Sequence, residues 1–568
     1  MKKITMSSCR LNAPVRLCLA MYLSSSTLLM AQALPNAGSS LRESQQSAPV
    51  LPPPATGTIE VAPDAQTPLP AVDAMRFQVN AFRVSGNQVF DSVVLLTLVQ
   101  DVTGGERSLD QIEQAASRIT AYYREHGYLV ARAYVPAQDI KDGVVEIAVL
   151  EGRYGEVRLD NRSGVADAIV QRYVTPQRLG EAVSDAALER AILLIQDTTR
   201  AAQAGGNLQP GATPGSTDLT LTVGPAPALS ARLEADNYGV RNTGRNRIGG
   251  ALQWNNPSGN GDRLDVRLFS TTIGQDYGRL GYSIAVGGDG ARLGLAYAES
   301  RYAVGGNFSL LNVYGRAGVW SASASYPLVR SRAFNLNLEG GLDQKLLQDH
   351  LGAFASSADK SNRVIGAGLN GDARNRVAGA DGTTVFNLRI ESGQLNIASP
   401  TERAIDDFSA RTNGAYQRLS YGLTQYQWLS GNTMLMLAVN GQEASKNLDS
   451  AEKMSLGGPF AVRAYPSGEA SGDEGYVATA EIRHVLNQQL LPGQLTLSGF
   501  VDHGMVRTNA RPFIEGDNQR RLSGAGVGVT FAMPDRLELR VVYAHKLGNA
   551  PARSDMDQAG RLWGMLAL

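Results

Sequence analysis

The chain has 568 residues, of which 43% are hydrophobic and 19% are charged, and this balance excludes disorder along its whole length. Its 53 basic and 53 acidic residues cancel, and once the first 33 residues are set aside, 49 basic residues face 53 acidic ones. The sequence therefore carries no basic footprint for nucleic acid, and we expect no nucleic-acid partner.

Residues 1–33 have the order of a secretory signal peptide. A basic, acid-free start is followed by the apolar run LCLAMYLSSSTLLM and by the small-residue cleavage site AQA. An N-terminal membrane anchor is the alternative, but the apolar run is short and three serines interrupt it. Both cysteines, Cys9 and Cys18, lie inside this peptide, so the mature chain contains no disulfide.

Residues 34–75 are rich in Pro, Ala and Ser and are predicted to form a linker or an N-terminal extension. The only structural signal in this range is a weak one for a short helix near Leu41 to Gln46. After the signal peptide, no stretch reaches the roughly eighteen consecutive apolar residues of a membrane helix. A membrane protein is then possible only as a closed β-barrel.

Two small α+β modules follow in tandem, at residues 76–152 and 153–225. The first reads as a strand, two helices and two strands, and its second helix, SLDQIEQAASRITAYYREHG, begins at the N-cap Ser108 and stops at Gly127. In this helix Ile112, Ala115 and Ile119 are expected to pack into the core. The second module repeats the same plan and ends in the strand DLTLTV.

Residues 226–568 contain no helical pattern and read as sixteen antiparallel strands of about ten residues each. Segments such as RLDVRLF and RLELRVVY alternate aliphatic and charged residues. A soluble sandwich would show the same alternation, so periodicity alone does not decide between them. The signal peptide, the cysteine-free mature chain and the length of this single strand plan favour a transmembrane barrel, whose lumen is wide enough for an extended polypeptide.

Catalytic chemistry finds little support in the sequence. The five histidines are scattered, and there is no H-E-x-x-H, no G-x-S-x-G elbow and no phosphate-binding glycine loop. The acidic residues are numerous, but spacing alone singles out no pair for glycoside chemistry. We therefore predict no enzymatic activity, no cofactor and no metal site.

One long connection, residues 445–474, contains the stretch GGPFAVRAYPSGEASGDEGY. Connections of this length without structure of their own are usually functional or disordered. In the later strand LTLSGFVDHG, alternation turns Asp502 toward the lumen, where a confined carboxylate needs a cation or several donors. Arg463 is a natural partner if the loop folds back into the pore. The alternative is that Asp502 contacts pore water and Arg463 is solvated outside.

At these residues the chain resembles a known family. VRAY followed by GEASGDEGY, with FVDHG on a later strand, is similar to the sixth extracellular loop and the F-x-D-x-G strand of the Omp85 superfamily. More specifically, the chain resembles the two-partner secretion transporters of the TpsB or haemolysin-activator type. The segments DNYGVRNTGRNR, NNPSGNGDRL and YVPAQDIKDGVVEIAVLEG agree with this resemblance.

The resemblance implies two periplasmic POTRA domains followed by a sixteen-stranded barrel in the outer membrane. The POTRA domains would capture an unfolded exoprotein through its N-terminal secretion domain, and the barrel would export it without ATP. The implied partners are a TpsA-like adhesin, haemolysin or toxin, the lipid of the outer membrane and the barrel assembly machinery. An Omp85-type insertase is the alternative, although insertases usually carry three or more POTRA domains.

The resemblance also implies a site, in which Arg463 of the loop reaches Asp502 on the barrel wall. The loop tip would be Val462, Arg463, Ala464 and Tyr465, and the receiving strand would supply Phe500, Asp502 and Gly504.

Three features depart from the family pattern. Ala464 stands where glycine is commonest, the Pro-rich composition of residues 34–75 argues against a long plug helix, and the chain ends in Leu568 where an aromatic residue is common.

Overall fold

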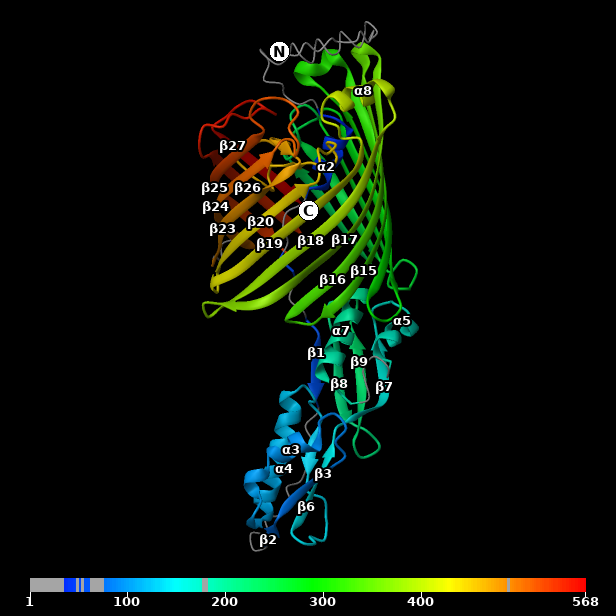
Figure 1. Cartoon of the computed structure of the whole chain (residues 1–568), viewed down its shortest axis with the longest axis vertical. Coiled ribbons are helices and arrows are strands. Elements are labelled where there is room, and N and C mark those ends of the chain that lie inside the picture. The colour runs from blue at the N-terminus through cyan, green and yellow to red at the C-terminus, as the bar shows by residue number, and fades with distance from the viewer. Residues whose placement is uncertain (1–34, 47–50, 53–55, 62–75, 176–181, 488–490) are drawn as a thin grey trace, which may run out of the picture.

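The computed structural model describes residues 35–46, 51–52, 56–61, 76–175, 182–487 and 491–568. A closed barrel stands above two small α/β modules that follow one another along the long axis of the molecule (Figure 1). The predicted signal peptide, residues 1–33, lies outside the described residues. None of the helices in the described ranges is long and apolar enough to cross a membrane.

In the first module, helix α4 packs against small sheets in the orders β3-β6-β5 and β2-β4. The Ser108 side chain accepts the Gln111 N–H, and the Gln111 side chain accepts the Ser108 N–H, so the two residues form a capping box. Ile112, Ala115 and Ile119 are buried in the core, as their spacing predicts. The elements are β2 Arg76–Val79, β3 Ala81–Ser85, α3 Ser92–Thr97, η1 Gln100–Val102, β4 Gly105–Ser108, α4 Leu109–Glu125, β5 Arg132–Tyr134 and β6 Val144–Leu150.

The second module has one four-stranded sheet in the order β1-β8-β9-β7, with α7 against it. Its strand β1 (Thr58–Val61) comes from the segment before the first module and pairs in parallel with β8. The other elements are β7 Arg153–Asn161, α5 Asp167–Gln171, η2 Arg172–Val174, α7 Asp185–Thr199, β8 Ala204–Pro210 and β9 Ser216–Val223.

The barrel has sixteen antiparallel strands, which confirms the predicted number and order. Three residue pairs between β10 and β27, from Glu234↔Ala567 to Asp236↔Met565, close it. Its strands are β10 Leu229–Asp236, β11 Arg247–Asn255, β12 Arg263–Thr271, β13 Gln275–Val286, β14 Ala291–Ala303, β15 Val313–Arg330, β16 Phe334–Leu351, β17 Ser356–Val377, β18 Ala380–Ile397, β19 Gly414–Ser430, β20 Thr433–Ala444, β23 Glu474–Leu486, β24 Gln494–Arg507, β25 Gln519–Met533, β26 Leu537–Lys546 and β27 Gly560–Ala567. The connections contain η3 Gly306–Leu311, η4 Gly352–Phe354 and α8 Pro400–Phe408.

Side-chain exposure identifies the two faces of the barrel wall. Leu268, Leu280 and Leu295 are 57%, 52% and 67% exposed on the outside, where a soluble protein would bury them. On β12 and β13 the charged residues Asp265, Arg267 and Arg279 alternate with these leucines and face the lumen. The outward apolar face favours the barrel over the sandwich that periodicity had left open.

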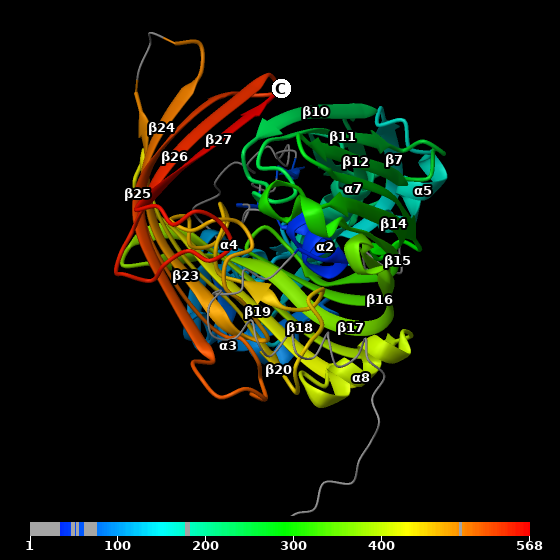
Figure 2. The same ribbon diagram turned by 90° about the horizontal axis from the view of Figure 1, so that it is seen from above.

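Residues 34–75 differ from the expected linker at two places. Ala37–Gln45 form helix α2, which lies inside the ring of strands (Figure 2), and Thr58–Val61 form β1. The helix ends before the Pro-rich stretch begins. Asn36 caps its start, because the Asn36 side chain accepts the Ser39 N–H. The helix overlaps the weakly predicted one near Leu41 to Gln46 but begins earlier, at Ala37, in a nine-residue segment without proline.

The second module is fastened to the lower rim of the barrel. Arg330, at the end of β15, forms a bidentate ion pair with Asp197 of α7 at 2.7 and 3.0 Å. Arg190 of α7 donates to the Pro327 carbonyl at 2.8 Å. These contacts place the second module beneath the rim of the barrel, at the lower ends of β15 and β16 (Figure 1).

Candidate functional site in the barrel lumen

The connection between β20 and β23 folds back into the lumen. Two short strands, β21 (Met454–Ser455) and β22 (Ser471–Gly472), pair with each other and give this loop a base. Between them the tip residues Val462, Ala464 and Tyr465 are fully buried. A surface loop would expose such side chains, so the tip is an internal element of the barrel.

Arg463 binds Asp502 of β24 through three hydrogen bonds. Its Nε and Nη2 atoms donate to the two carboxylate oxygens at 2.9 and 2.8 Å, and its backbone N–H donates at 3.1 Å. Asp502 is fully buried and also accepts the Thr479 hydroxyl at 3.0 Å. The planar fork of a guanidinium suits this two-oxygen geometry.

The same guanidinium has two further contacts. Its Nη1 donates to Glu481 of β23 at 2.6 Å, and its centre lies 3.3 Å from the centroid of the Phe500 ring. Arg483 donates to the other oxygen of Glu481 at 2.7 Å, so two cations and two buried carboxylates balance. Arg463 therefore ties the loop tip to two adjacent strands at once.

The seven residues of the predicted site lie together in one place: Val462, Arg463, Ala464, Tyr465, Phe500, Asp502 and Gly504. Glycines on the wall make room for the tip. A side chain at Gly504 would come within 2.9 Å of Leu456 and 3.3 Å of Val462, and one at Gly524 would come within 2.5 Å of the Ala464 methyl group. Ala464 has no positive φ, so the departure from glycine requires no left-handed backbone.

A second attachment, on other strands of the barrel wall, was not predicted. Glu452 of the loop is fully buried and pairs with Lys345 of β16, while its second oxygen lies 2.8 Å from Arg418 of β19. Asn362 of β17 donates to Glu452 at 2.8 Å. A single glutamate in a polar loop carries no sequence signal, because its partners lie about 35 to 110 residues away.

Two more carboxylates of the loop, those of Glu469 and Asp449, accept hydrogen bonds from residues outside the loop. Glu469 accepts hydrogen bonds from Arg520 at 3.0 Å and from the Ser554 hydroxyl at 2.7 Å. Asp449 accepts one from Lys360 of β17 at 2.9 Å. The loop is thus held by ion pairs on several strands.

Helix α2 packs against this loop. Arg42 donates to the Lys453 carbonyl at 2.8 Å and to the Ser471 hydroxyl at 3.0 Å, and Ala37 N–H donates to Asp349 at 2.7 Å. Burial raises the pKa of Glu43 to about 7, although Arg42 and then Arg247 oppose the shift. Within the described residues, no group of three histidine, cysteine or acidic side chains is arranged to hold a metal ion.

Comparisons with known proteins agree with this architecture. Residues 77–152 match the family "POTRA domain, ShlB-type", and residues 215–531 match the family "Haemolysin secretion/activation protein ShlB/FhaC/HecB". The heme/hemopexin transporter protein HuxB of Haemophilus influenzae strain 86-028NP is 30% identical over 484 residues, which cover 83% of this chain and 84% of that protein. The outer membrane transporter CdiB of Dickeya dadantii strain 3937 is 24% identical over 436 residues, or 75% of each chain.

A solved structure shows the same fold. CdiB from Escherichia coli superposes with a TM-score of 0.71 at 18% identity, over 99% of this chain and all of that one. The barrel and its POTRA region therefore form an outer-membrane protein with the modules on the periplasmic side. With more than half of its length matched by one family model, the chain belongs to the haemolysin secretion/activation family ShlB/FhaC/HecB, and it is a transporter of the two-partner secretion type, not an enzyme.

Proposed function

We propose that this transporter captures an unfolded exoprotein in the periplasm by its N-terminal secretion domain and exports it through the lumen, past the loop that Arg463 anchors. The exoprotein is an adhesin, a haemolysin or a toxin of the TpsA kind. The barrel contacts outer-membrane lipid through its exposed leucines, and its insertion depends on the barrel assembly machinery.

The observation that carries this proposal is the polar attachment of the lumen contents. Arg42 holds α2 by hydrogen bonds, which water can replace when the helix moves, whereas the buried ion pairs of Arg463 and Glu452 keep the loop on the wall. A sixteen-stranded barrel is wide enough for an extended chain once α2 is displaced. The arrangement suits a conduit that opens for a polypeptide.

Capture by strand addition is supported by β1. This four-residue strand already adds in parallel to β8, so the sheet of the second module accepts an extended segment at that edge. An edge strand presents unpaired N–H and C=O groups that bind many sequences. We expect the exoprotein to bind residues 77–224 in the same manner.

The test compares the proteins that the native host secretes before and after deletion of the gene. We expect one large exoprotein to disappear from the medium and to return with the wild-type gene. The Asp502→Asn variant, at equal abundance in the outer membrane, should restore it only in part. An unchanged set of secreted proteins would refute the export function.

The same strain separates export from insertase activity. An insertase would lower the amounts of many outer-membrane barrels, whereas a dedicated exporter leaves them unchanged. If many outer-membrane barrels were lost and no particular exoprotein were missing from the medium, the insertase alternative would be favoured.

A further inference from the structure

Two arginines on the barrel wall have no part in the site described above. Arg267 of β12 and Arg279 of β13 lie directly opposite each other in register. Like charges at opposed positions destabilise a sheet. Among the described residues, neither side chain has an acidic or hydrogen-bonding partner. The barrel therefore keeps an unfavourable pair that its own residues do not neutralise.

The neighbouring charges are already paired. Arg263 donates to Asp265 at 2.9 Å, and the other oxygen of Asp265 accepts the Gln253 amide at 3.1 Å. Arg232 lies 2.7 Å from Glu234 and 3.0 Å from Glu538. Arg292 of β14 donates to the Gly261 carbonyl and the Ser283 hydroxyl. Among the described residues that line the cavity on this part of the wall, Arg267 and Arg279 are therefore left as arginines without a hydrogen-bonding partner.

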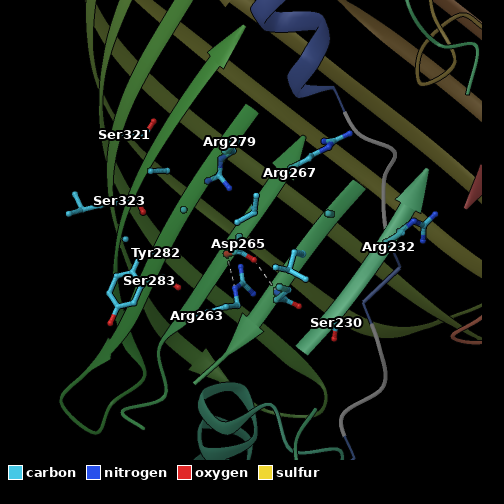
Figure 3. Close-up of a pocket in the computed structure, with 18 of the residues that line it drawn as sticks. Ser230, Arg232, Arg263, Asp265, Arg267, Arg279, Tyr282, Ser283, Ser321 and Ser323 are labelled. Atoms are coloured by element: carbon cyan, nitrogen blue, oxygen red, sulfur yellow. Dashed lines mark hydrogen bonds and ion pairs between the residues drawn. The ribbon is translucent and has the colours of Figure 1, made fainter. Parts of the chain in front are cut away.

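The two arginines line a cavity of about 610 Å³ on the inner wall of β10–β15 (Figure 3). Small residues, among them Gly281, Ser321 and Ser323, form its other side. A side chain at Gly281 would come within 3.2 Å of the Arg279 guanidinium. These small residues leave the two charges open to a group in the lumen.

The cavity lies at the periplasmic entrance. The β11–β12 connection touches the second module, where Asn256 donates to the Gly164 carbonyl at 2.7 Å and Ala166 N–H donates to the Gly259 carbonyl at 2.9 Å. Arg263, which lines the cavity, is the first residue of β12 after this connection. Helix α2 lies above the cavity in Figure 3. A chain that leaves the second module meets this wall before it meets α2.

We propose that Arg267 and Arg279 form an anion-binding station for the carboxylate side chains of an acidic segment in the exported polypeptide. The proposal rests on the proposed export function and adds a sequence preference to it. Guanidinium groups match carboxylates in two bonds, and arginines in pore walls select anions. In a wet lumen such contacts are weak enough to release the chain.

The test uses the full-length protein in planar bilayers. The reversal potential is measured in a KCl gradient, and the current is then blocked from the periplasmic side with polyglutamate. In the double variant Arg267→Gln, Arg279→Gln we expect the reversal potential to shift toward cation preference and the Kd of block to rise about tenfold. Tenfold corresponds to about 1.4 kcal/mol, which two solvated charge pairs can supply.

A matched control is available on the neighbouring strands. Arg301 of β14 and Arg316 of β15 also lie directly opposite each other, on the outer face, with Glu299 and Gln348 as partners. Their double glutamine variant loses the same charge and should change neither measurement. The double variant Arg267→Lys, Arg279→Lys should keep the anion preference.

Several results would contradict the proposal that Arg267 and Arg279 bind acidic segments of the exported polypeptide. One is an unchanged reversal potential together with unchanged polyglutamate block in the correctly folded double glutamine variant. If inorganic phosphate blocks the current and polyglutamate does not, the two arginines do not bind a polypeptide. If the host exports no partner, the proposed function fails while the selectivity result still stands; if export persists without any change in selectivity or block, only this inference fails.

Discussion

Breaking the Arg463–Asp502 pair should weaken the barrel more than a surface ion pair would. Arg463→Ala leaves a fully buried Asp502 with only the Thr479 hydroxyl and one backbone N–H. Asp502→Asn leaves the guanidinium with Glu481 alone as its anion. Removing one partner of a buried pair costs about 3–5 kcal/mol, so each single variant should lose about this much free energy of unfolding.

The double variant makes this prediction specific. Since it removes both charges, we expect it to cost about 2–3 kcal/mol less than the sum of the single variants. Urea unfolding of the barrel refolded in lipid vesicles measures the three differences, and secretion of the exoprotein is followed in parallel. Additive effects would show that the two groups are not coupled, which would refute the reasoning from geometry.

Three further predictions concern other contacts in the lumen. Glu452→Gln leaves Lys345 without its carboxylate and should lower the free energy of unfolding by about 3 kcal/mol. The loosened loop should then be cleaved by trypsin inside residues 445–473, and an uncut loop would contradict this prediction. Gly504→Val should cost about 1–3 kcal/mol in the same urea titration, because its side chain would collide with Leu456; a neutral effect would mean that the tip moves aside freely. Because the pKa of Glu43 is raised from 4.5 to about 7, α2 should be held best below about pH 4.5 and lose about 3 kcal/mol of docking as the pH rises from there through 7. Bilayer conductance between pH 5 and pH 8 should therefore rise in the wild type and stay flat in Glu43→Gln, and equal profiles would contradict the assignment.

Periodicity and capping predicted the helices and strands of the chain, whereas the choice of a barrel over a sandwich also needed the signal peptide, the cysteine-free mature chain and the length of the strand plan. The α4 capping box and the alternation of RLDVRLF are local signals, since each depends on residues within a few positions of one another. The predicted helix over FDSVVLLTLVQDVTG was correct in type but wrong in extent, because α3 ends at Thr97 and a separate turn of 3-10 helix follows. The boundary depends on how this segment packs on the sheet, which the local pattern does not contain.

The site was only partly accessible from the sequence. Arg463 and Asp502 could be proposed as partners because alternation fixed which way Asp502 points and the family motif joined the two segments. Glu452 had no such help, since its partners lie on β16, β17 and β19 and meet only when the barrel closes. Helix α2 was predicted only weakly, as a short helix near Leu41 to Gln46, because the proline content of residues 34–75 outweighed the nine residues that form it.

The contacts in the lumen indicate the order in which its contents would leave. Helix α2 buries only two apolar side chains, Ala37 and Leu41, and its hydrogen bonds run mostly to uncharged groups such as the Lys453 carbonyl, which accepts from Arg42; water can replace such a bond at about 1.5–3 kcal/mol. The loop, in contrast, is held on two separate parts of the wall by Glu452 and Arg463, whose buried partners would each cost about 3–5 kcal/mol to separate. A polypeptide that enters from the periplasm would therefore displace α2 first and pass beside a loop that stays attached to the wall.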